Sequence, residues 1–279
     1  MSEVKISAKD VAALRKETGA GMMDCKKALI EAGGDMEAAK DILRKKGQKL
    51  SAKRADRDAK EGVVIAQVAE GAKSGVIVNL SCETDFVAKN EDFINLAKTI
   101  AGIAIDNNVT THDALLATSF DGKLSVADKV TEQMGVIGEK VEVSKFEFLE
   151  SEMVVSYIHA GYRRGVLVGL NKAGDFTESG KGVAMQVAAM NPIAVDKDDV
   201  DSSVIEKEIE IGMEQARQEG KPEAMLERIA QGKLGKFFKE NTLLNQEYVR
   251  GENKQTVGAY LKTVDSDLTV TGFKHVGLG

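Results

Sequence analysis

The sequence lacks tryptophan, and aromatic residues make up only 5% of its 279 positions. A chain with so few rings offers little for nucleobases to stack on, and its net charge of -6 gives phosphate groups no general attraction. Apolar runs of the roughly 18 to 20 residues that span a bilayer are missing too. We therefore expect neither nucleic acid nor a membrane as a direct partner.

Cysteine is also scarce. Cys25 and Cys82 are the only two, and they stand too far apart in the sequence to form a metal-binding or redox motif. The opening residues, MSEVKISAKD, carry early acids and show no apolar signal segment. Together these features favour a reducing, cytoplasmic environment.

Common enzyme motifs are absent as well: there is no P-loop, no dinucleotide-binding glycine pattern and no HExxH. We interpret His112 and His275 as structural. A hydrolase built on Cys82 and His159 is the catalytic alternative, although nothing near either residue in the sequence orients it. We expect no catalytic residue, no metal site and no cofactor.

What the chain does contain is an uneven charge distribution. Residues 1–55 hold 13 Lys and Arg against 8 Asp and Glu, whereas the remainder holds 25 against 36. With 43% hydrophobic residues, the chain is long enough to fold as two compact domains. The basic segment is either an ordinary solvated surface or a binding surface for an acidic protein face or nucleic acid.

Residues 1–55 predict three short helices. The first starts after Ser7, the second spans about 22–32, and the third runs from Asp35 to Gly47. The charged stretch 48–62, which has almost no large apolar side chains, predicts a linker.

The second of these helices begins with two adjacent methionines. We expect Met23, Leu29 and Ala32 to be buried in the core of the three helices. Neighbouring positions on a helix point in different directions, so Met22 and Met23 cannot both be buried in so small a core. One of them is expected to face solvent or a partner, where methionine adapts well.

An internal repeat links the two halves of the remaining sequence. Segment 61–86 aligns without gaps to 151–176, with eight identities at a constant offset of 90 residues, among them Val64/Val154 and Gly75/Gly165. Each copy contains two β-branched apolar runs joined by a glycine-containing turn, and a helical pattern follows. We predict two related subdomains, each a β-hairpin covered by helices.

The second copy carries an insertion that predicts a pair of helices packed as a coiled coil. Its apolar spacing suggests a register in which Ile209 meets Gly232 and Gly212 meets Ile229. After this insertion, the tail 268–279 alternates like a strand and is expected to return to the second sheet.

Asp-Phe stands at the same place in both copies, as Asp85-Phe86 and Asp175-Phe176. At such a corner the acid can cap the following helix and the ring can pack against its first turn. The surrounding residues differ, since the first copy reads CETDFVAKN and the second KAGDFTESG. The pair itself is therefore partly architectural.

These pieces together resemble the elongation factor Ts family, the nucleotide-exchange factors for the GTPase elongation factor Tu. Three stretches carry the resemblance: TGAGMMDCKKAL at 18–29, TDFVAK at 84–89 and HAGYRRGVLV at 159–168. The match runs nearly from end to end. It implies an α+β fold whose parts are a ubiquitin-associated-like three-helix module at 1–55, core subdomain 1 at 56–140, and core subdomain 2 at 141–279 with a coiled-coil insertion at about 198–239.

The resemblance also implies which residues bind the partner. The segment that enters the GTPase near its magnesium and phosphate site, called here the exchange wedge, consists of Thr84, Asp85, Phe86 and Val87. The N-terminal module docks through Met22, Met23 and Lys26. Weaker contacts from the core are assigned to Ile137, Gly138, His159 and Val249. The factor carries no cofactor of its own and acts on the GDP and magnesium bound to its partner.

Two departures from the family pattern affect the weaker contacts. The turn after His159 is longer by one residue, and Arg250 follows Val249 where relatives often have an apolar side chain. A rival interpretation is an adaptor that binds a ubiquitin-like protein or RNA through residues 1–55 alone. The coiled coil also offers a surface for self-association.

Overall fold

The computed structural model describes residues 6–251 and 254–278. Its helices are α1 (Ala8–Thr18), α2 (Met22–Glu31), α3 (Met36–Arg54), α4 (Asp85–Ala88), α5 (Glu91–Asp106), α6 (His112–Ala117), α7 (Val126–Ile137), α8 (Thr177–Met190), α9 (Ser202–Gln218), α10 (Leu226–Asn241) and α11 (Val257–Val264). Its strands are β1 (Glu61–Val68), β2 (Ser74–Cys82), β3 (Val141–Glu150), β4 (Met153–His159), β5 (Arg164–Leu170) and β6 (Val270–Gly277). This mixture of helices and antiparallel sheets confirms the α+β class.

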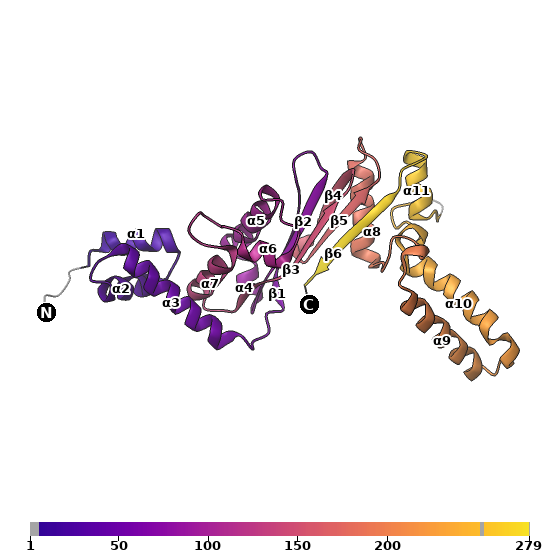
Figure 1. Cartoon of the computed structure of the whole chain (residues 1–279), viewed down its shortest axis with the longest axis horizontal. Coiled ribbons are helices and arrows are strands. Elements are labelled where there is room, and N and C mark those ends of the chain that lie inside the picture. The colour runs from indigo at the N-terminus through magenta and orange to yellow at the C-terminus, as the bar shows by residue number, and fades with distance from the viewer. Residues whose placement is uncertain (1–5, 252–253, 279) are drawn as a thin grey trace.

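The molecule is elongated (Figure 1). Helices α1 to α3 form one end, two three-stranded sheets lie in the middle, and the pair α9 and α10 extends at the other end (Figure 1). Among the helices that the structure describes, none has both the length and the apolar character that a membrane crossing requires.

The three N-terminal helices pack around a small core of their own, which includes Leu14, Cys25, Leu29 and Ala39. The start of α1 is fixed by a capping box, in which Ser7 and Asp10 satisfy each other's backbone N–H groups. Asp35 caps α3 by accepting a hydrogen bond from the Ala38 N–H.

The prediction that the third helix ends at Gly47 is wrong, because α3 continues to Arg54, into the first part of the expected linker. Gly47 instead allows close helix packing. A Cβ atom added there would lie 2.7 Å from the Thr131 carbonyl oxygen of α7, and one added at Gly135 would lie 3.0 Å from the Gly47 Cα. The two glycines let α3 cross α7 almost backbone to backbone, and this crossing joins the N-terminal helices to the rest of the chain.

The first sheet has the order β1-β2-β3, and the second has the order β4-β5-β6. Strand β6 pairs antiparallel with β5, which confirms the expected return of the tail to the second sheet. Strand β3 was not predicted. The sequence-based division after residue 140 assigns it to the second subdomain, whereas its hydrogen bonds join it to β2 of the first sheet.

Successive strand residues point to opposite faces, and nearly every residue of β2 and β5 is buried, so both faces of these central strands are covered. On one side Val76, Val78 and Leu80 of β2 pack with the helices of the first copy. The corresponding residues of β5, Val166, Val168 and Leu170, pack with the helices of the second copy.

On the other side the two sheets pack against each other, and the repeat explains how. A Cβ atom at Gly75 would lie 3.0 Å from the Leu167 side chain, and one at Gly165 would lie 3.4 Å from the Ile77 side chain. Gly75 and Gly165 are equivalent in the repeat, as are Ile77 and Leu167. Each copy therefore places its glycine against the branched residue of the other, as two subunits of a symmetric dimer would.

Helices α9 and α10 pack side by side, but the predicted register is wrong. A Cβ atom at Gly212 would lie 3.1 Å from the Ala230 Cα, whereas one at Gly232 would have no atom within 4 Å. Gly232 is exposed. Small residues and leucines form the contact between the helices. The buried ones are Gly212, Ala216, Leu226, Ala230 and Leu234.

Candidate partner-binding site

The predicted exchange wedge forms a separate short helix, α4, directly after β2. Thr84 is its N-cap residue, in place of the expected acid, and its hydroxyl accepts a hydrogen bond from the Val87 N–H at 3.5 Å. Val87 packs against the first core, but the Phe86 side chain points away from it and is 83% exposed. Phe86 is the most exposed of the large apolar side chains on the described surface, and aromatic rings are enriched in protein interfaces.

Asp85 is half-buried and forms an ion pair with Lys89 one helical turn later, at 2.6 Å. Its hydrogen bond with Lys89 lowers the pKa of the Asp85 carboxyl. The acid next to the exposed ring is therefore ionised at neutral pH and can accept hydrogen bonds from a docked partner.

Two carboxylates hold the backbone just before the ring. Glu139 accepts hydrogen bonds from both the Thr84 N–H, at 3.0 Å, and the Thr84 hydroxyl, at 2.7 Å. Glu83 accepts from the Lys140 N–H at 2.7 Å and forms ion pairs with Arg54 and Arg57.

The Glu83 side chain is only 15% exposed. Burial alone would raise the pKa of its carboxyl. The Lys140 N–H and the guanidiniums of Arg54 and Arg57 outweigh that effect and lower the pKa to about 2. Sequence reasoning missed both carboxylates because Thr84 and Glu139 are 55 residues apart, and Glu83 and Lys140 are 57 residues apart.

The second copy of the repeat arranges its Asp-Phe pair differently. Phe176 precedes α8 as its N-cap residue and is partly buried against the second core. Its ring folds back over Gly174, where an added Cβ would lie 2.7 Å from the ring carbon Cε2. The two phenylalanines occupy equivalent positions in the sequence, yet only the first is presented to solvent.

A second exposed apolar surface lies on the N-terminal helices. Met22 is 59% exposed and Met23 is 64% exposed. The expectation that Met23 belongs to the core is therefore wrong, because Cys25, Ala28 and Leu29 supply the buried face of α2. Both methionines line a shallow groove together with Val11, Arg15, Lys16 and Lys26. An apolar floor with a basic rim suits an acidic, partly apolar protein surface.

The corner after α7 lies close to the wedge. Gly138 ends this helix with a left-handed conformation, φ 82°, and Ile137 is partly buried against the first core. Glu139, the next residue, makes the hydrogen bonds to Thr84 described above. The corner and the wedge are thus joined directly.

His159 and Val249, the other predicted contacts, lie on the second half of the core. His159 is exposed at the end of β4, and its Nδ1 atom lies 3.0 Å from the Tyr157 hydroxyl. Val249 is 53% exposed, while its N–H donates to the Gln186 side-chain oxygen at 2.9 Å. Tyr248 beside it is buried and stacks on Tyr260.

Cys82 has the features of a structural residue. Its thiol is buried and donates to the Thr84 carbonyl at 3.1 Å. Burial, with the nearby Glu139 carboxylate, raises the pKa of the Cys82 thiol to about 12. A thiol that stays protonated at neutral pH is a poor nucleophile, so the hydrolase alternative loses its support.

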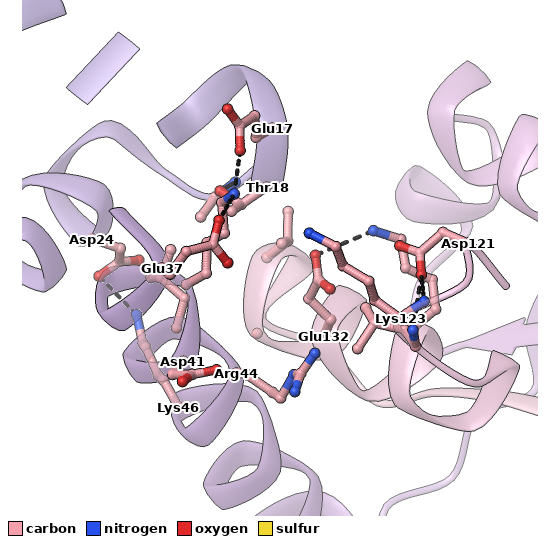
Figure 2. Close-up of a pocket in the computed structure, with 17 residues that line it drawn as sticks. Glu17, Thr18, Asp24, Glu37, Asp41, Arg44, Lys46, Asp121, Lys123 and Glu132 are labelled. Atoms are coloured by element: carbon pink, nitrogen blue, oxygen red, sulfur yellow. Dashed lines mark hydrogen bonds and ion pairs between the residues drawn. The ribbon is translucent and has the colours of Figure 1, made fainter. Parts of the chain in front are cut away.

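A polar cleft separates the N-terminal helices from α7 and the loop before it (Figure 2). On one wall Lys46 pairs with Asp24 at 2.7 Å, and on the other Lys129 pairs with Glu132 at 3.1 Å. Arg44 extends from α3 toward Glu132 across the cleft (Figure 2). Acids and bases are nearly balanced around it, so the cleft does not favour an ionic ligand of either sign.

No group of three or more His, Cys, Asp and Glu side chains within 6–251 and 254–278 is placed to hold a metal ion.

Comparison with known proteins gives one consistent result. The family model described as elongation factor Ts matches residues 83–279. Elongation factor Ts from Christiangramia forsetii is 55% identical over 276 residues, which cover 99% of each chain. The protein of that name from Flavobacterium psychrophilum is 50% identical over 98% of this chain and 99% of its own. The one from Chlorobium phaeobacteroides is 43% identical over 99% of both.

Proposed function

The chain belongs to the elongation factor Ts family, and we propose that it promotes GDP release from elongation factor Tu by inserting Phe86 beside the magnesium and phosphate site of that GTPase. Family members act as guanine-nucleotide exchange factors in translation elongation, which takes place in the cytoplasm. The exchange wedge Thr84–Val87 performs this step, and no side chain of the factor reacts chemically with the nucleotide.

One observation carries this proposal. Phe86 is 83% exposed, although it lies shortly after a buried strand and is the second residue of a helix that is otherwise anchored in the core. A ring of this kind gains free energy when a partner buries it, about 1.5 to 3 kcal/mol for a full side chain. That gain is available to stabilise a form of the GTPase in which the elements around magnesium have moved.

The energetics of exchange require only that the factor bind the nucleotide-free GTPase more tightly than the GDP-bound form. The nucleotide weakens the affinity of the GTPase for the exchange protein by a certain ratio. The exchange protein then weakens the affinity of the GTPase for the nucleotide by the same ratio, because the coupling is reciprocal. Phe86 supplies apolar contact in the displaced arrangement, and the ionised Asp85 accepts hydrogen bonds from backbone that has moved. The factor speeds the approach to equilibrium and leaves the ratio of bound GDP to bound GTP unchanged.

Docking precedes this step. The groove that contains Met22 and Met23 is apolar, with Lys26, Arg15 and Lys16 at its rim. Flexible methionine side chains adapt to the surface they meet, and the basic rim attracts an acidic helix or loop of the partner. We assign docking to this face, with Ile137, Gly138, His159 and Val249 as further contacts of the core.

We also propose a role for each part of the chain. Residues 1–55 serve as a ubiquitin-associated-like docking module, and the two repeat copies form the core subdomains. The first subdomain extends to about residue 150, because β3 pairs with β2. The helical pair within about 198–239 is a coiled-coil insertion in the second.

Release of labelled GDP from elongation factor Tu tests the proposal. We expect Phe86→Ala to lower the maximal stimulated rate about 10- to 100-fold, since tenfold corresponds to about 1.4 kcal/mol. Phe176→Ala, at the equivalent position of the second copy, should leave that rate within about twofold. Circular dichroism and thermal melting verify that both variants are folded. A maximal rate that Phe86→Ala leaves unchanged would remove this ring from the mechanism.

A further inference from the structure

Three segments that are distant in the sequence meet at Glu83 and Thr84, the residues that precede Asp85 and Phe86. They are the end of β2, the corner after α7 and the end of α3. Glu83-Thr84 and Glu139-Lys140 hold each other in a reciprocal manner: the Glu139 carboxylate accepts the Thr84 N–H, and the Glu83 carboxylate accepts the Lys140 N–H. We call these four residues the carboxylate junction.

The end of α3 is part of the same arrangement. Arg54 and Arg57 pair with Glu83. In the opposite direction, the Lys140 ammonium donates to the carbonyl oxygens of Ala55 and Arg57, each at 3.1 Å. The junction therefore fastens the wedge both to the corner at Ile137 and Gly138 and to the helix that carries the N-terminal module.

The wedge needs such support because α4 has only four residues. A helix of one turn is too short to be stable by itself in water. The Phe86 ring lies in solvent, so it contributes little packing that could fix its own orientation. What holds α4 in place is the packing of Val87 and Ala88 and the fastened backbone at Glu83 and Thr84.

We propose that Glu139 and Glu83 are positioning residues for nucleotide exchange, which hold Phe86 in its inserting orientation before the partner arrives. This inference rests on the proposed function of the wedge. A preordered ring loses less conformational freedom on insertion. Release of one or two backbone residues from a fixed conformation lowers the maximal exchange rate about 5- to 30-fold. The docking groove lies on other helices and keeps its affinity.

The orientation of the ring can be measured without the partner. The chain has no tryptophan, so Phe86→Trp introduces a single indole in the wedge, which can be excited selectively at wavelengths that tyrosine does not absorb. We expect time-resolved anisotropy to show faster local motion of this indole in Glu139→Ala than in the parent. Glu147→Ala is the matched control, since it removes an ion-paired carboxylate, 2.9 Å from Lys274, on β3 and away from the junction. Equal anisotropy decays in Glu139→Ala and the control overturn the proposal.

Exchange kinetics with elongation factor Tu give the second test. Glu139→Ala should lower the maximal rate of GDP release about tenfold and leave the half-saturating concentration within about twofold. A double-mutant cycle shows whether Glu139 acts through the ring: in the Phe86→Ala background, Glu139→Ala should have no further effect. Additive losses, or an effect on half-saturation alone, overturn the proposal.

Two further variants distinguish a loss of positioning from a loss of stability. The same set of measurements also distinguishes failure of this inference from failure of the proposed function. Glu139→Gln retains one accepting oxygen and should recover part of the lost rate, and exchange assayed well below the melting temperature of both variants separates this recovery from a change in stability. If Glu139→Ala melts too low to be assayed, the same comparison is made with Glu139→Gln and Glu83→Gln. If Phe86→Ala itself leaves exchange unchanged, the proposed function fails, whereas the anisotropy result still decides whether the junction orders the ring.

Discussion

The two Asp-Phe corners of the repeat start from the same residue pair and end in opposite states. Phe86 is 83% exposed at the tip of α4, whereas Phe176 is partly buried against the second core. Both follow the second strand of a hairpin, and both precede the helices that cover their sheet. The difference therefore comes from the neighbours of the pair and not from the pair itself.

The residue two positions before the ring explains part of the difference. Gly174 lets the Phe176 ring fold back, since a Cβ there would lie 2.7 Å from the ring. The first copy has Thr84 at this position, and its side chain blocks the same conformation. Thr84 is also the residue that Glu139 holds. One substitution thus excludes the buried position of the ring and fastens the exposed one.

The residue three positions before the ring differs in the same sense. Glu83 joins β2 to α3 through Arg54 and Arg57, and Ala173 in the second copy carries no charge with which to do so. The duplicated corner presents its ring to solvent in one copy and packs it on the core in the other, and the residues at 83 and 84, against 173 and 174, account for part of this difference.

The largest effect that would sharpen this comparison concerns stability and pH. Glu83 has its pKa lowered from 4.5 to about 2, and each pKa unit is worth about 1.4 kcal/mol, so its ionised form contributes up to about 3 kcal/mol. A lowered folded-state pKa gives stability that is present above pH 4.5 and lost as the pH falls toward 2. We expect Glu83→Gln to be less stable than the parent at pH 7, and the difference to shrink between pH 4.5 and 2 in urea titrations.

Glu178→Gln in the second copy serves as the control, because its pair with Lys181 is largely exposed and worth little. A difference between the parent and Glu83→Gln that stays constant with pH would contradict the assignment of this carboxylate to the junction.

A somewhat smaller effect would separate the two rings by stability. Phe176→Ala removes a partly buried ring from the second core and should lower the free energy of unfolding by about 2 kcal/mol. Phe86→Ala removes a ring from solvent and should change it by less than about 0.5 kcal/mol. Chemical denaturation measures the loss of stability in each variant. Phe176→Ala should lose more stability than Phe86→Ala, whereas Phe86→Ala should lose more of the GDP-release rate. Equal losses of stability would break the comparison.

The smallest effect tests the cause directly. Gly174→Thr gives the second copy the residue of the first and should displace the Phe176 ring at a cost of about 1 kcal/mol. With Phe176→Trp as a reporter in the otherwise tryptophan-free chain, the emission maximum should move to longer wavelength when Gly174→Thr is added. An unshifted maximum would mean that the ring finds another buried position.

Much of this architecture could be predicted because it depends on local patterns. The hairpins and their helices follow from runs of β-branched residues and helical spacing, and the duplication follows from the constant offset. The missed strand, β3, and the misjudged Gly47 depend on contacts between distant segments. Gly47 resembles a helix end in the sequence, but it is placed against the Thr131 carbonyl of α7.

The candidate site also has features that the sequence predicts and features that it does not. The motif around Asp85 and Phe86 could be found by its resemblance to a family. The Asp-Phe pair alone does not predict how exposed the ring is, because Phe176 in the second copy is partly buried against the core. The error at Met23 has a related cause, since the face of α2 that is buried depends on its packing with the other helices, and Cys25, Ala28 and Leu29 supply it. The register of α9 and α10 was misjudged because Ala230 fills the place assigned to Ile229.

The continuation of α3 past Gly47 has a geometric consequence. The helix has 19 residues and therefore a length of about 28 Å, with the docking module at one end, the carboxylate junction at the other and the crossing with α7 between them. The helix is held against α7 at Gly47, so its length on either side of this residue sets the distance to each end. One residue inserted between Met36 and Gly47 would turn the module by about 100° relative to the wedge. Under the proposed function, the spacing in this helix sets the angle between the two surfaces that one partner contacts.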